Sequence, residues 1–150
     1  MRVSAVMLLA VVMPQMVAAQ AQPATEANSG GQPVGTMSEL MVRVIYPASD
    51  AIFYIATRTP SNGEEWAELE GTALILAESG NLLMTPARAW DDDQWMRDAQ
   101  LMRNAGEAAF SAAKDRNVEA LEGLNDQLYQ SCVTCHQHYR PDYPGYGSQP

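Results

Sequence analysis

The chain has 150 residues and a formal net charge of −9 at neutral pH, with 18 acidic against 9 basic side chains. This length suits one domain around a single core. An acidic surface keeps a chain soluble and argues against nucleic acid or anionic lipid as partners, so we expect any docking partner to be basic.

Residues 1–20 have the pattern of a secretory signal. Arg2 is a short basic start, an almost unbroken apolar run follows from Val3 to Met13, and small residues at 17–21 offer cleavage sites. The apolar run is too short to span a bilayer, so we expect a cleaved signal peptide, with an uncleaved N-terminal anchor as the alternative.

The remainder divides by composition. Residues 21–35 are rich in Ala, Pro, Gly, Gln and Ser without an apolar period, which predicts a flexible leader. From Thr36 onward the apolar period is helical, and no stretch alternates as a half-buried strand would. The sequence therefore predicts an all-α domain over residues 36–140 and an irregular tail over 141–150.

The first expected helix begins at a Thr36 or Ser38 cap. Its apolar stripe consists of Met37, Leu40, Met41, Val44, Ile45, Ala48, Ile52 and Ile55. Pro47 falls inside that stripe, and because proline removes one backbone hydrogen bond we expect a kink there.

Two further helices are expected in the middle of the chain. The second begins at Ser61 or Asn62 and ends before Pro86. Asp91–Asp93 opens the third, where carboxylates suit the positive end of the helix dipole. The alternative is a metal-binding acid cluster. Adjacent residues on a helix project in different directions, so these three carboxylates would have to turn toward one another to bind one ion. The tryptophans are expected in core or loop packing: Trp66, Trp90 and Trp95.

The last expected helix is capped by Asn117 and carries a Cys-x-x-Cys-His run that uses both cysteines of the chain. Cys132 and Cys135 are three residues apart, so on a helix they share a face and can each form a thioether with a haem vinyl group. His136 follows and can ligate the iron through its imidazole. The run therefore predicts one covalently attached haem c.

Two other uses of these cysteines were weighed. A zinc site needs four ligands, and the chain offers only Cys132, Cys135, His136 and His138 within seven residues. A thioredoxin-like redox pair belongs near a βαβ pattern, which the sequence lacks. His138 lies about 200° around the helix from His136, so we expect it to be solvated.

Four helices with short connections predict an up-down-up-down antiparallel four-helix bundle. With the haem motif near the end of the fourth helix, followed by Tyr139 and Arg140, the chain resembles the class II c-type cytochromes, the cytochrome c′ group and its low-spin relatives. The resemblance covers residues 36–140. It implies haem attachment in the periplasm, a proximal environment that includes Tyr139 and Arg140, and the homodimers that are frequent in the family.

The resemblance also directs attention to the first helix, where the family places the residue on the distal side of the haem. An apolar residue there leaves the iron open to nitric oxide or carbon monoxide, whereas a Met gives a low-spin electron carrier. Met41 is the expected distal ligand, with Met37 one turn earlier or an open site as alternatives. Met41 would equally suit ordinary core packing.

The expected function is that of a periplasmic mono-haem c-type cytochrome carrying one electron between redox protein partners. It would not be transmembrane once processed. No nucleophile–base pair, phosphate loop or dinucleotide motif is present in the sequence, so we expect no enzymatic activity. The alternatives are a gas-binding haem protein with an open distal site and a non-haem exported helical protein with a Cys132–Cys135 disulfide.

Overall fold

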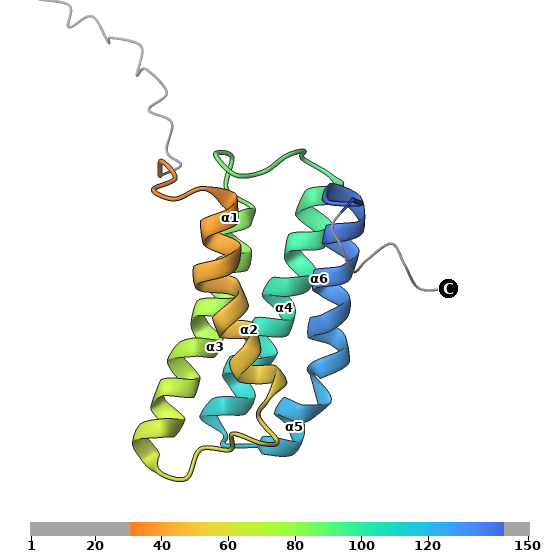
Figure 1. Ribbon diagram of the computed structural model, residues 1–150. Helices are drawn as coiled ribbons and strands as arrows, with labels where there is room; N and C mark the ends of the chain where they lie inside the picture. Colours follow the sequence, from red (N-terminus) through yellow and green to blue (C-terminus); the bar gives the residue numbers. More distant parts are fainter. Residues whose placement is uncertain (1–30, 143–150) are drawn as a thin grey trace, which may run out of the picture.

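The computed structural model describes residues 31–142, and all the regular elements in that range are helices. In chain order they are α1 Met37–Leu40, the π-helix η1 Met41–Ile45, α2 Tyr46–Phe53, α3 Gly63–Leu83, α4 Gln94–Lys114, α5 Val118–Gly123 and α6 Asn125–Tyr139. Figure 1 shows α1, η1 and α2 as one continuous stretch, which we call the first helical stretch (37–53), and this stretch runs alongside α3, α4 and α6. The all-α prediction is confirmed for the described residues.

The expectations for the signal peptide, for most of the leader and for most of the tail lie outside the described residues. Residues 31–35 of the leader carry no helix. The last helix ends at Tyr139, just before Pro141.

Side-chain caps fix where several helices begin. Thr36 and Glu39 form a capping box in which each side chain accepts the backbone N–H of the other. Asn62 accepts two N–H groups of α3 at 3.0 Å, and Asn117 accepts one of α5 at 3.0 Å. At α4 the carboxylate of Asp91 accepts two backbone N–H groups. The sequence predicted all four starts, and these bonds show which side chain does the capping.

The irregularity expected at Pro47 takes the form of a π turn that precedes it. The N–H of Tyr46 donates to the carbonyl of Met41, five residues earlier. Pro47 has no N–H, and its ring crowds the carbonyl of the residue four positions before it, Arg43. A wider turn on the N-terminal side of the proline lets the helix continue, and this turn contains Met41.

The helix predicted from Asn117 through Tyr139 is interrupted. Leu124 is both the C-cap of α5 and the N-cap of α6, and its N–H donates to the carbonyl of Leu121 three residues back. Gly123, a weak helix former, lies just before the break. The core face continues across it, since Leu121 and Leu128 are both fully buried.

Buried apolar side chains from every helical stretch meet in one core. Its members are Leu40, Ile45, Ala48, Ile52, Ile55, Trp66, Leu69, Ala73, Leu76, Leu83, Trp95, Ala99, Met102, Ala105, Ala109, Ala112, Ala113, Leu121 and Leu128. α4 packs against α3, α5 and α6, while α3 also contacts η1 and α2. Within residues 31–142, no helix has both the length and the apolar character needed to cross a bilayer.

Candidate functional site

The residues of the Cys-x-x-Cys-His run lie together near the end of α6. Cys132 and Cys135 are free thiols, and both are half-buried, as is His136. Their spacing along a regular helix brings Cys132 beside Cys135 and places His136 one turn after Cys132. The helix thus arranges two thiols and an imidazole on adjoining parts of its inner surface.

Two cavities flank this part of α6. The first, of about 470 Å³, is lined by Met37, Ser38, Met41, Trp90, Trp95, Cys135, His136, Tyr139, Arg140, Pro141 and Asp142. The second, of about 530 Å³, is lined by Met41, Val42, Ile45, Tyr46, Ser49, Phe53, Asp98, Met102, Tyr129, Ser131, Cys132, Cys135 and His136. Met41, Cys135 and His136 line both cavities, so they stand where the two meet.

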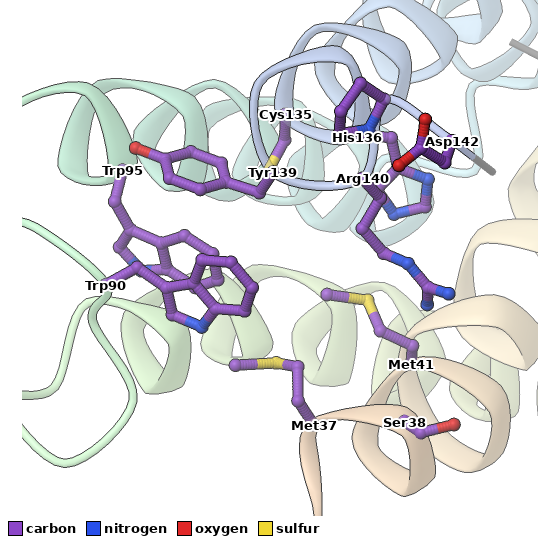
Figure 2. A pocket seen from close by; sticks show the side chains of 11 residues that line it. Met37, Ser38, Met41, Trp90, Trp95, Cys135, His136, Tyr139, Arg140 and Asp142 are labelled. Atoms are coloured by element: carbon purple, nitrogen blue, oxygen red, sulfur yellow. The ribbon is translucent and has the colours of Figure 1, made fainter.

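The first helical stretch supplies the facing wall. In Figure 2 the side chains of Met37 and Met41 rise from it toward the part of α6 that carries His136. Met37 reaches only the first cavity, whereas Met41 borders both. The two distal candidates predicted from the sequence therefore both face the motif, and Met41 has the more central position.

Burial controls the chemistry of the three motif side chains. It raises the pKa of Cys132, and it raises the pKa of Cys135 to about 12 with help from the negative charge of Asp98. Burial, and then the positive charge of Arg140, lowers the pKa of His136. The site therefore holds protonated thiols beside a neutral imidazole, the form in which histidine binds a metal.

An aromatic cluster lines one side of the first cavity. The rings of Trp90 and Trp95 stack with centroids 5.8 Å apart, and Tyr139 meets them edge-on at 5.5 Å and 4.9 Å. Trp95 is buried and donates its indole N–H to the carbonyl of Leu83, while Trp90 is largely exposed in the loop before α4. Figure 2 shows this cluster on one side of the cavity and Arg140 on the other.

Tyr139 and Arg140 both line the first cavity together with His136. The hydroxyl of Tyr139 donates a hydrogen bond to Asp91. Partial burial and this contact raise the pKa of Tyr139 to about 12, and the same hydrogen bond is the main cause of the lowered pKa of Asp91. Asp91 thus both caps α4 and fastens Tyr139 in the aromatic cluster.

His138 is exposed, as expected, with 42% of its side chain accessible, but it also has a bonding partner on α4. Its Nδ1 lies 2.7 Å from Oδ2 of Asp98, whose side chain is only 1% exposed. His138 lies about one turn after Cys135, on the side of α6 that packs against α4. The sequence did carry a signal for Asp98, because this carboxylate falls on the apolar stripe of α4 between Trp95 and Met102.

Among residues 31–142, no group of three or more His, Cys, Asp and Glu side chains is arranged to hold a metal ion. Comparisons with protein-family models, with curated proteins and with solved structures find no match for this chain.

Proposed function

We propose that the chain is an exported mono-haem c-type cytochrome that carries one electron between redox protein partners in the periplasm. The observation that carries the proposal is the convergence of Met41 with Cys135 and His136 where two cavities meet. A thioether, two thiols and an imidazole from two separate helical stretches then surround one site, and this donor set is the one used by Met/His-ligated c-type haem.

The size and lining of the site suit a large apolar cofactor. Volumes of about 470 Å³ and 530 Å³ fall within the range of roughly 300–1,000 Å³ usual for cofactor sites. Cys132 and Cys135 would hold the haem through thioethers, His136 would ligate the iron on the proximal side, and Met41 on the distal side. A bound haem would supply a reversible ferric–ferrous couple.

The protein's own groups would restrict and tune that couple. Trp95 and Tyr139 form an aromatic wall of the first cavity, and Tyr139 is held in place by Asp91. The neutral imidazole of His136 keeps its lone pair available for the iron. A thioether from Met41 favours ferrous iron and raises the reduction potential relative to an open site.

The architecture we propose for this function is an up-down-up-down antiparallel four-helix bundle with the haem near the end of the last helix. The side-by-side arrangement of α3, α4, α6 and the first helical stretch supports it, as do the short loops between them. The acidic charge of the chain favours a redox partner with a basic docking surface.

Intact mass spectrometry tests the attachment. After co-expression with a haem-attachment system and extraction in acid-acetone, the mass should exceed that of the polypeptide by one haem. Cys132→Ala and Cys135→Ala should each weaken haem retention, and the double variant should abolish it. Thr134→Ala, between the cysteines, is the matched control and should keep the haem. A wild-type mass equal to the bare polypeptide would reject the proposal.

A further inference from the structure

A buried carboxylate lies beside the candidate haem site, and the proposed ligand set does not use it. Asp98 of α4 is only 1% exposed, and it is a charged residue on a helix face whose other members are core residues. Replacing a buried charge by an apolar side chain of similar volume is often neutral or stabilising, so packing alone gives little reason for a carboxylate here.

Two donors hold the Asp98 carboxylate. Gln94 Nε2 donates to Oδ1 at 2.8 Å, within the same helix. His138 Nδ1 lies 2.7 Å from Oδ2, and since a carboxylate only accepts, the imidazole is the donor. Hydrogen bonds to both oxygens fix the position of the Asp98 side chain.

The same carboxylate forms part of the wall of the second cavity. Asp98 lines that cavity with Met41, Cys132, Cys135 and His136. Its negative charge contributes, after burial, to the raised pKa of Cys135. The charge of Asp98 therefore acts on the place where the proposed haem would be attached.

We propose that Asp98, held by Gln94 and His138, lowers the reduction potential of the haem iron and thereby selects the redox partners with which the chain can exchange its electron. This inference rests on the proposed function. A bound haem would take one electron from a reduced partner, so the partner would be oxidised and the site would lose one unit of positive charge. A nearby negative charge stabilises the ferric state more than the ferrous, and a buried charge is weakly screened.

Asp98 therefore opposes Met41, whose thioether favours the ferrous state. The two side chains border the same cavity, one from α4 and the other from η1. Their balance would set the potential of the protein. Asp98 itself touches neither partner nor iron in this account, so it is a positioning and tuning residue.

Asp98→Asn in the haem-loaded protein provides the test. Asparagine keeps the size of the side chain and can still bond to both Gln94 and His138, but it removes the charge. A potentiometric titration at one fixed pH should give a more positive midpoint than wild type, with an unchanged visible spectrum. Glu107→Gln, which removes an exposed charge from the same helix, is the matched control and should leave the midpoint where it was.

Asp98→Leu removes both the charge and the hydrogen bonds, and it should shift the midpoint in the same direction while also altering stability. A loaded Asp98→Asn protein with the wild-type midpoint would overturn the inference and leave Asp98 as a brace between α4 and α6. A wild-type chain that never acquires haem would instead overturn the proposed function, and this inference with it.

Discussion

The α3–α4 pair and the part where the first helical stretch faces α6 are packed in different ways. Between α3 and α4 there is no spare room: a Cβ added at Gly106 would lie 2.5 Å from the backbone nitrogen of Ala77. A Cβ added at Gly80 would lie 2.6 Å from the Cβ of Arg103. The two helices therefore touch almost backbone to backbone, with glycine where they come closest.

Between the first helical stretch and α6, by contrast, lie two cavities of about 470 Å³ and 530 Å³. Long side chains such as Met41 and Tyr139 border them in place of glycine and alanine. The contrast indicates that the two parts differ in what stabilises them. α3 and α4 form a tightly packed scaffold, and no bound molecule is needed to complete its packing. The other half, formed by the first helical stretch and α6, is what we call the hollow half. A molecule that fills its cavities would stabilise it, because a ligand stabilises only the state that binds it.

The largest effect is expected from Met41→Leu in the hollow half. In the haem-loaded protein this change should convert the iron completely from low-spin, six-coordinate to high-spin and open it to carbon monoxide and nitric oxide. The fold should persist, because Leu for Met costs less than about 1.5 kcal/mol in a core. Absorption spectra with and without carbon monoxide measure the change.

Two controls accompany that variant. Met84→Leu, at the end of α3 and outside both cavities, should keep the wild-type spectrum. If Met37→Leu causes the conversion and Met41→Leu does not, the ligand lies one turn earlier on the first helical stretch. If neither changes the spin state, a thioether is not the distal ligand.

The reactivity of Cys135 in the haem-free chain should show how far the two cavities are shielded from solvent. In the reduced, haem-free chain at about pH 8, Cys135 should be alkylated by iodoacetamide much more slowly than in denaturant, because its pKa rises from 9.0 to about 12 and only the thiolate reacts. Mass spectrometry of quenched samples gives the rates. Equal rates in the folded and denatured chain would mean that the cavities are open to water.

The same pKa shift has a consequence for stability, because the thiol is harder to ionise in the fold than in the unfolded chain. Below pH 9 both states keep the proton, and the thiol does not affect unfolding. As the pH rises from 9.0 toward about 12 the unfolded chain loses its proton first, so the free energy of unfolding of the haem-free protein should fall. Cys135→Ala should weaken this dependence.

Where α3 and α4 come closest, the addition of a single methyl group should destabilise the fold. Gly106→Ala must push α3 and α4 apart and should lower the free energy of unfolding by about 1–3 kcal/mol. Gly71→Ala is the matched control, since an added Cβ there meets nothing within 4 Å, and it should stabilise α3 by about 0.5–1 kcal/mol. Urea titrations of the haem-free chain give both values. Stabilisation by both changes would contradict the close approach of the two helices.

The smallest effect is expected where the hollow half meets solvent. Thr36→Ala removes the capping box at the start of the first helical stretch and should cost about 1 kcal/mol. Thr36→Ser keeps a hydroxyl and should cost much less. Thermal melts of the two variants distinguish them, and equal losses would mean that the hydroxyl does not cap the helix.

Sequence reasoning worked best where local chemistry decides the outcome. Caps at Thr36, Asn62 and Asn117 were predictable because one side chain satisfies backbone groups a few residues away. The apolar stripes gave the core for the same reason, since a helical period depends only on neighbours along the chain. The thiols and imidazole of the haem motif lie adjacent in the sequence, so their proximity on α6 was also foreseeable.

The features that could not be predicted from the sequence depend on contacts between segments that are distant along the chain or on the exact path of the backbone. The π turn of Met41–Ile45 adds one residue to the helical turn before Pro47. One added residue changes the spacing of apolar side chains too little to be recognised in the sequence. The pairing of Asp98 with His138 joins residues 40 positions apart, and it required knowing which face of α6 meets α4. The stacking of Trp90 on Trp95 depends on the path of a loop.

The most direct test of a haem held between Met41 and His136 is the visible spectrum of the reduced, loaded wild-type protein before and after carbon monoxide is added. The account predicts the sharp bands of a low-spin, six-coordinate ferrous haem, unchanged by the gas because a thioether occupies the sixth position. An immediate shift on adding carbon monoxide would contradict Met ligation and favour gas binding. A protein without any haem absorption would contradict the site itself.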